Sequence, residues 1–212
     1  MRLDIPWIEA LRSKRVILAS GSPRRKEILS NLGLNFEIVP SLFPETLDKS
    51  VYKPKLYVSE TARQKALEVY ERLANDKENP PNLVVGADTI VVLGDDILEK
   101  PHTPERAHSM LRQLSGRSHS VFTAVALVAP GPRTHVFVEE TEVLFSELSD
   151  ETIEAYVKTG EPLDKAGAYG YQGLASFFVS SIRGDYWNVV GFPTCRFFAE
   201  LQIFLEKSGP KE

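Results

Sequence analysis

Leu18-Ala19-Ser20-Gly21-Ser22-Pro23-Arg24-Arg25 is the stretch of this chain from which the fold can be worked out. The apolar run 16–18 leads into it and predicts a strand. A Ser/Gly/Ser turn follows, and Pro23 stands where a helix would have its first residue, with Ser22 as the N-cap. The pattern therefore predicts a strand, a tight turn and a helix over residues 23–32.

The charges after this cap are unusual. The first turn of a helix carries partial positive charge, so acidic residues stabilise it there, but this helix would begin with Arg24 and Arg25. An anion between the two guanidinium groups would remove the repulsion, and phosphate binds both to helix N-termini and to arginine. The alternative is an ordinary cap with solvated surface charges.

Length and composition indicate one large domain or two small ones in a globular protein. The chain has 212 residues, 42% of them hydrophobic and 25% charged. We expect a single domain over residues 15–207, preceded by a peripheral segment 1–14 with a short helix. The net charge of −4 argues against a sequence-independent grip on nucleic acid, so a phosphate site would have to be local.

Cysteine and histidine usage excludes an internal disulfide and a zinc site of the CxxC type. Cys195 is the single cysteine, and we expect it in the core, with a reactive thiol as the alternative. The four histidines show no metal-ligand spacing. No apolar run reaches the roughly 18–20 residues of a membrane span, and residues 1–15 do not resemble a signal peptide. These features predict a cytoplasmic protein with no membrane partner.

A helix over residues 55–74 is predicted by apolar side chains at helical spacing. Lys65 falls between Ala62 and Val69 on the inward side of this helix, where an ammonium group needs an anionic partner. The alternative is that Lys65 extends to solvent from the edge of the apolar stripe. A strand over 36–39 and a polar loop over 41–53, which holds Glu45, precede the helix.

The strand-like run over residues 83–93 is apolar on both faces, which predicts a central strand. Asp88 interrupts it, and a charge there is costly unless it is paired, hydrogen-bonded or bound to a metal. We expect Gly86 to mark a bulge that turns Asp88 into a cleft. The alternative is an aspartate satisfied by local backbone N–H groups.

The remaining elements follow from periodicity and turn residues. A hairpin is expected at 97–101, with Lys100 at its exit, and further helices and strands at 103–114, 118–127, 134–145, 150–158, 177–182 and 195–205. The run 164–173 has three glycines at three-residue intervals and predicts a loop that closes on a flat ligand, or a flexible surface loop. It lacks the glycine order of a dinucleotide-binding fold, and the chain has no P-loop motif.

Four segments together resemble the Maf family of nucleoside triphosphate pyrophosphatases. They are 18–25 (LASGSPRR), 85–89 (VGADT), 99–101 with 114–116 (EKP and LSG), and 161–173 (EPLDKAGAYGYQG). The resemblance covers nearly all of residues 15–205. It implies a mixed α/β fold similar to that of the inosine triphosphate pyrophosphatases, with an elongated central mixed sheet flanked by helices and a cleft between two lobes.

The resemblance also implies hydrolysis of a nucleoside triphosphate to the monophosphate and pyrophosphate, dependent on Mg²⁺ or Mn²⁺. It implies that Asp88 is the acid–base residue and that Glu45 and Asp88 hold the metal. It further implies that the substrate is bound by a set of polar and basic residues from distant parts of the chain: Ser20, Arg24, Arg25, Lys65, Thr89, Lys100, Asp164, Lys165 and Gln172.

The branch of this family that acts on dTTP and UTP resembles this chain at Arg24, Thr89 and Gln172. The amide of Gln172 could pair with the edge of a pyrimidine. We therefore expect dTTP, UTP and modified pyrimidine triphosphates as substrates. Two alternatives stay open: a nucleotide-binding regulator of cell division without turnover, and a pyrophosphatase for inosine or 7-methyl-guanosine triphosphate. Relatives in this family are often homodimers, which the sequence does not test.

Overall fold

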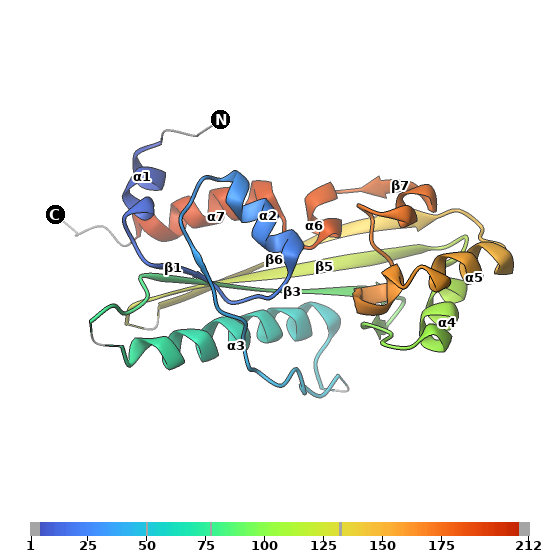
Figure 1. Ribbon diagram of the computed structural model, residues 1–212, viewed down its shortest axis with the longest axis horizontal. Helices are drawn as coiled ribbons and strands as arrows, with labels where there is room; N and C mark the ends of the chain where they lie inside the picture. Colours follow the sequence, from blue (N-terminus) through green and yellow to red (C-terminus); the bar gives the residue numbers. More distant parts are fainter. Residues whose placement is uncertain (1–4, 50, 77, 132, 208–212) are drawn as a thin grey trace.

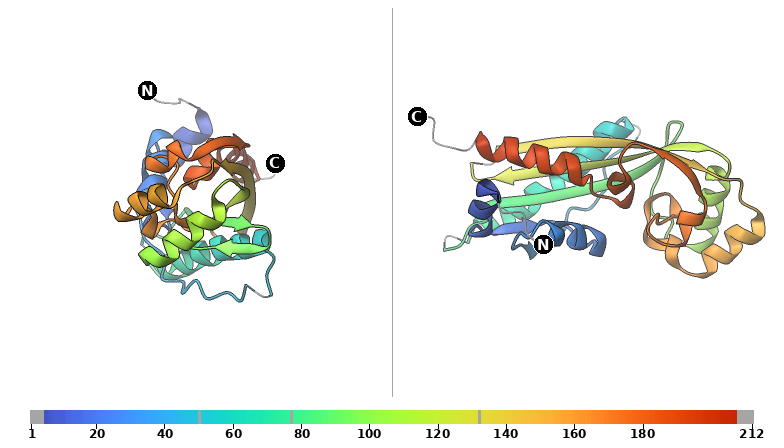
Figure 2. Two further views of the ribbon diagram at one scale, coloured as in Figure 1. Left: turned by 90° about the vertical axis from the view of Figure 1, so that its right-hand side faces the viewer. Right: turned by 90° about the horizontal axis from the view of Figure 1, so that it is seen from above.

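A computed structural model describes residues 5–49, 51–76, 78–131 and 133–207. The chain forms an elongated molecule built on one long, twisted sheet with helices on both faces (Figure 1; Figure 2). This is the mixed α/β architecture that the sequence predicts. The strands are β1 Val16–Leu18, β2 Glu37–Ile38, β3 Leu83–Leu93, β4 Asp96–Leu98, β5 Ser118–Ala129, β6 Arg133–Phe145 and β7 Val179–Arg183.

Strand β3 is central in the sheet, as its two-sided apolar sequence predicts. The strand order is β2-β1-β3-β5-β6-β7, with β4 also paired to β3. The pairs β1–β2 and β1–β3 are parallel, and the other pairs are antiparallel. The sheet is therefore mixed, with short parallel strands at one edge and long antiparallel strands across the rest.

The helices divide the molecule into two lobes. Helix α3 runs along one face of the sheet, while α1, α2 and α7 cover the other face at the same end (Figure 1). Helices α4 and α5 and the short 3-10 segments form a smaller lobe at the far end. The helix bounds are α1 Pro6–Arg12, α2 Pro23–Asn31, α3 Pro54–Ala74, α4 Pro104–Leu114, α5 Asp150–Lys158, α6 Tyr186–Val190 and α7 Thr194–Glu206, with 3-10 turns η1 Glu161–Asp164, η2 Ala166–Ala168 and η3 Leu174–Phe177.

Alternation along β3 separates the two faces of the sheet. Val84, Ile90 and Val92 pack in the core under α3, whereas Leu83 and Val85 pack under α2 and α7. On that second side, α1 adds its buried apolar residues to the core, so it packs onto the domain. Asp88 therefore belongs to the α3 face and its neighbour Thr89 to the opposite face.

One edge of β3 is open in the middle. Strand β1 pairs with residues 83–85 at one end of that edge, and β4 pairs with residues 91–93 at the other. Strand β5 covers the opposite edge continuously from residue 84 to 92. The stretch 86–90, which contains Asp88 and Thr89, therefore has no strand beside it on the open edge within the described residues. A cleft can reach both faces of the sheet there.

The bulge predicted at Gly86 is absent, so that prediction is wrong. The register between β3 and β5 runs through this residue without interruption, so no bulge turns Asp88 outward. Instead, a Cβ at Gly86 would lie 2.7 Å from the carbonyl oxygen of Ala62 and 2.8 Å from Cβ of Ala66. The glycine is needed because α3 crosses β3 at close range, and this approach brings Lys65 to Asp88.

Two further expectations need correction or completion. Cys195 is exposed at the start of α7 rather than buried in the core. Helix α6 was not expected, although Asp185 caps its first turn by accepting a hydrogen bond from Trp187 N and a glycine at positive φ ends it. In the described part of the chain, no helix combines the length and the apolar character that crossing a lipid bilayer requires.

Candidate active site

A cleft of about 850 Å³ opens at the unpaired edge of β3, between the two lobes. Its volume lies in the range of small-molecule sites. Ten of the eleven site residues expected from the sequence line it, although they come from six separate parts of the chain: Ser20, Arg24, Arg25, Glu45, Lys65, Asp88, Thr89, Lys100, Asp164 and Lys165.

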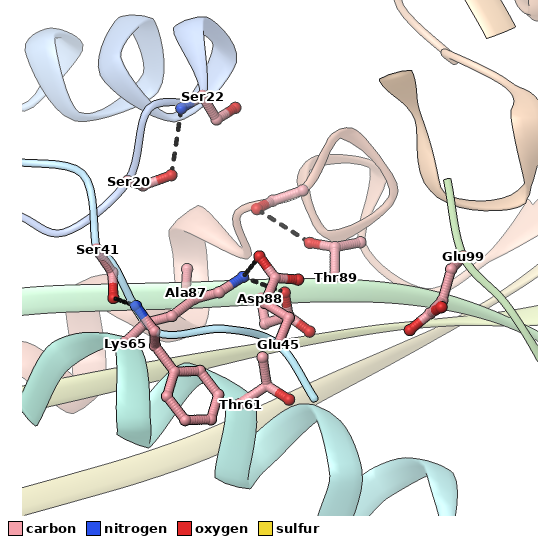
Figure 3. Close-up of polar contacts among 12 residues, drawn as sticks. Ser20, Ser22, Ser41, Glu45, Thr61, Lys65, Ala87, Asp88, Thr89 and Glu99 are labelled. Atoms are coloured by element: carbon pink, nitrogen blue, oxygen red, sulfur yellow. Dashed lines mark hydrogen bonds and ion pairs between the residues drawn. The ribbon is translucent and has the colours of Figure 1, made fainter. Parts of the chain in front are cut away.

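At the centre of the cleft, one lysine is shared by two carboxylates. Lys65 Nζ lies 2.8 Å from Asp88 Oδ1 and 2.8 Å from Glu45 Oε1 (Figure 3). Both Lys65 and Asp88 are largely buried, with 13% and 11% of their side chains exposed. Lys65 thus points inward to anionic partners rather than to solvent, and Asp88 is paired with a lysine rather than satisfied only by local backbone N–H groups.

Glu45 is held in its charged form by this arrangement. Burial raises the pKa of the Glu45 carboxyl, but the charges of Lys65, Lys100 and Arg25 outweigh burial and leave the pKa below its ordinary value. The loop that carries Glu45 is tied down nearby, because Glu68 on α3 accepts hydrogen bonds from the hydroxyl of Ser41 and the backbone N–H of Leu42.

The N-terminus of α2 faces the cleft with few of its backbone donors satisfied. Ser22 is the N-cap residue, as expected, but its side chain makes no capping hydrogen bond within the described structure. Ser20 accepts one from the N–H of Ser22 at 3.3 Å instead. Ser20 and Arg24 both line the cleft. A helix N-terminus without a side-chain cap, next to an arginine, is suited to binding an anion.

Arg25 differs from Arg24, because protein groups already bind most of its donors. Its guanidinium donates to the carbonyl oxygens of Ala87 at 2.9 Å and Gly191 at 3.0 Å. It also donates to the hydroxyls of Ser20 at 3.2 Å and Thr89 at 2.9 Å. Ala87 lies in the open part of the β3 edge, so the guanidinium replaces the strand that is missing there and joins α2, β3 and the end of α6.

Thr89 lines the cleft, and its hydroxyl is also part of a hydrogen-bond network that extends into the protein interior. Its hydroxyl shares a 3.0 Å hydrogen bond with Thr123, whose hydroxyl lies 3.0 Å from the carbonyl oxygen of Asn188 on α6. Thr123 and Asn188 are fully buried. A change at Thr89 would therefore act on the position of Arg25 as well as on any bound molecule.

The smaller lobe supplies the opposite wall of the cleft. Lys165 Nζ donates to the backbone oxygen of Glu161 at 2.8 Å and to Asp164 Oδ1 at 2.7 Å. Burial raises the pKa of Asp164, but the charges of Lys165 and Arg24 outweigh it and lower that pKa overall. Arg24 of the large lobe is thus close enough to act on the acidic group across the cleft.

Gln172 is the expected site residue that the structure does not bring into the cleft. It is exposed in the turn between Gly170 and Gly173, whose backbone groups bond at 2.9 Å. The segment 164–173 is more ordered than a flexible surface loop, because it contains 3-10 turns. Glu161 stabilises it by accepting hydrogen bonds from Tyr156 Oη and the N–H of Leu174. That it closes on a flat ligand stays a prediction.

Sequence reasoning missed several residues that line the cleft. Tyr57 donates to Glu99 Oε1 at 2.9 Å, and both lie on its wall. An apolar portion of the wall comes from β3, β5, α6 and η2 with the residue after it, which meet only in three dimensions: Val91, Val121, Ala166, Tyr169, Val189 and Val190. Tyr57 lies outside the apolar stripe that predicted the helix, and no local pattern in the sequence singles it out.

The donors present fit a hard divalent cation only in part. Glu45 and Asp88 already converge on one cationic group, Lys65, so their oxygens could share a metal if that ammonium moved. No cluster of three or more potential metal ligands occurs among the described residues. Water and phosphate oxygens would have to complete the coordination, which is typical of Mg²⁺ sites.

Comparison with known proteins shows similarity to one family over most of the chain. A family model described as "Maf-like protein" matches residues 15–204. The chain is 53% identical over 204 residues to a human protein named "Probable bifunctional dTTP/UTP pyrophosphatase/methyltransferase protein". That match covers 92% of this chain and 33% of the human protein, so the chain spans about a third of that relative's length.

A second relative matches over most of its length. The dTTP/UTP pyrophosphatase of Bacillus cereus (strain ATCC 10987 / NRS 248) is 47% identical over 196 residues, which cover 92% of this chain and 93% of that protein. Among solved structures, a nucleoside-triphosphatase/dITP/XTP pyrophosphatase from Mycobacterium abscessus is 16% identical with a TM-score of 0.46, covering 92% of this chain and 98% of that one.

Proposed function

The chain belongs to the Maf-like protein family, and from that premise we propose that it hydrolyses dTTP, UTP and modified pyrimidine nucleoside triphosphates to the monophosphate and pyrophosphate. The relatives named as dTTP/UTP pyrophosphatases support this substrate class. The single observation that carries the proposal is Asp88, a buried carboxylate held 2.8 Å from Lys65 in a cleft with further basic residues.

The cleft suits a nucleoside triphosphate that lies across the open edge of β3. The phosphate chain would lie against the N-terminus of α2, with Arg24 on one wall and Lys100 and Lys165 on the other. Positive groups aimed at the phosphates stabilise the charge that moves to the leaving pyrophosphate, which is the main source of catalysis in phosphoryl transfer. The apolar wall that includes Val91 and Tyr169 would receive the base.

Asp88 would act as the general base. It would accept a proton from the water that attacks the α-phosphorus, and Lys65 Nζ lies 2.8 Å from its carboxylate. Glu45 and Asp88 would hold the divalent cation proposed here, which could be Mg²⁺ or Mn²⁺. When bound, such a cation would supply charge neutralisation and orient the phosphates. Because the proposed substrate is a small molecule, the proposed reaction needs no nucleic-acid or membrane partner.

A substrate panel with separate detection of pyrophosphate and phosphate tests the proposal. With Mg²⁺ or Mn²⁺ present, we expect pyrophosphate from UTP and dTTP, and a loss of about 1,000-fold or more in Asp88→Asn, the order expected when a catalytic base is removed. Intact triphosphates throughout, with saturable binding, would instead indicate a nucleotide-binding protein. A preference for inosine or 7-methyl-guanosine triphosphate would refute the pyrimidine assignment.

A further inference from the structure

His102 has an unusual backbone for a residue with a side chain. Its φ is 60°, in the left-handed region, and only Ala168 shares this property among the described residues other than glycine. Histidine tolerates the region better than most residues, but glycine would occupy it without strain. Backbone strain of this kind persists when the surrounding structure enforces it and is frequent at functional sites.

The backbone of His102 is fixed between two lysines of the cleft. Its N–H donates to the carbonyl oxygen of Leu163 at 3.2 Å. Lys100 lies two residues before His102, and Lys165 lies two residues after Leu163. Both lysines line the cleft, and so does His102. The strained residue is therefore placed in the wall that faces the α2 N-terminus, among the groups suited to bind phosphate.

Within the described residues, the His102 imidazole has no partner. His102 is exposed, and its side chain makes no hydrogen bond or ion pair with any described residue. Two other histidines do have partners, since His119 Nε2 lies 2.9 Å from Tyr169 Oη and His135 Nε2 lies 2.7 Å from Glu200 Oε2. The acidic group on the same wall, Asp164, is already bound by Lys165.

We propose that His102 donates a hydrogen bond from its imidazole to an oxygen of the phosphate chain. The inference rests on the proposed function, because it adds a substrate-contacting residue to the same cleft. Imidazole carries at least one N–H in either neutral tautomer and two when protonated. Phosphate oxygens are strong acceptors, and hydrogen bonds to charged groups are stronger than those between neutral groups. Contact with the substrate explains why a side chain is kept at a strained position.

Replacement by glycine separates this role from a structural one. In His102→Gly the strain is relieved, so we expect the melting temperature of the free protein to equal or exceed that of the wild type. We expect kcat/KM to fall about tenfold, by the same factor for UTP and dTTP, because a hydrogen bond to a charged group is lost. His102→Asn keeps a residue that tolerates this backbone and an N–H donor, and should recover part of the loss.

The control is His108→Ala, half-buried on α4 and outside the cleft, which should leave kcat/KM unchanged. Calorimetric titration with inorganic pyrophosphate should show about tenfold weaker binding to His102→Gly than to the wild type. Unchanged kinetics and unchanged pyrophosphate binding would overturn the inference, and so would a loss that differs between bases. A wild type that hydrolyses no triphosphate would refute the proposed function, while the pyrophosphate titration would still decide the role of His102.

Discussion

Gly86→Ala should damage catalysis from a position that touches no substrate. The new Cβ would lie 2.7 Å from the Ala62 carbonyl oxygen and 2.8 Å from the Ala66 Cβ, both on α3. Ordinary contacts between such atoms are about 3.5–4 Å, so α3 would have to withdraw by roughly 0.7–1.3 Å. Lys65 is carried by the same turn of this helix. Its 2.8 Å contact with Asp88 would lengthen to roughly 3.5 Å, beyond a good hydrogen bond.

Both stability and rate should respond to this displacement. Forcing an extra carbon into a packed interface costs about 1–3 kcal/mol, which corresponds to a fall in melting temperature of roughly 2–12 °C for a chain of this size. Displacement of a catalytic contact by close to 1 Å should lower kcat/KM for UTP by about 10- to 100-fold. Pyrophosphate release at 25 °C and thermal unfolding of the free protein measure the two effects.

Leu201→Ala is the matched control for lost stability. Leu201 is fully buried on α7, on the other face of the sheet, and its truncation should cost about 2–5 kcal/mol without moving α3. This variant should keep wild-type kcat/KM at 25 °C despite its lower melting temperature. If Gly86→Ala also loses stability but keeps wild-type kcat/KM, the close approach of α3 does not determine the Lys65–Asp88 contact, and the reasoning fails.

Three further predictions concern charged groups. Arg25→Lys should lower the free energy of unfolding, measured by urea denaturation, by about 1–3 kcal/mol, because one ammonium cannot replace the hydrogen bonds to the carbonyl oxygens of Ala87 and Gly191. Arg24→Lys should cause no such loss. Equal stability of the two variants would contradict this prediction. The pKa of Glu45 is lowered in the folded state, so its contribution to the free energy of unfolding is present above about pH 4.5 and is lost as the pH falls through the folded pKa. The stability difference between wild type and Glu45→Gln should therefore shrink on acidification. A difference that stays constant with pH would contradict this prediction. Burial lowers the pKa of His119 from 6.5 to about 4. Below pH 6.5 this histidine is protonated more readily in the unfolded chain, so the free energy of unfolding should fall by roughly 3 kcal/mol between pH 7 and pH 4. Denaturation of His119→Leu at a series of pH values should lack this pH dependence.

Local patterns in the sequence predicted most elements of the fold. The Ser-Pro start of α2, the apolar stripe of α3 and the two-sided apolar run of β3 each place a helix or strand within one or two residues of its observed bounds. Such patterns depend on neighbours along the chain, so they can be recognised without the tertiary structure. Cys195 shows the limit, because a small apolar residue at the start of a helix can face either way.

What the sequence determined about the site was its charge requirement. An aspartate in an apolar strand and a lysine on the inward side of a helix each need a partner of opposite charge or a hydrogen-bond partner, because burying an unpaired charge is too costly. The sequence thus predicted that Asp88 and Lys65 need partners, while their roles as site residues came from the family resemblance. It also indicated an anion for the arginines at the start of α2.

Only the tertiary structure decided how these groups meet. The open edge between β1 and β4 lets one cleft reach Asp88 on one face of β3 and Thr89 on the other, and it lets the Arg25 guanidinium bond the Ala87 carbonyl oxygen where no strand pairs with β3. It also places His102 in the cleft and Gln172 outside it. Strand pairing and the approach of α3 join residues far apart in sequence, and no local pattern carries information about contacts at that separation.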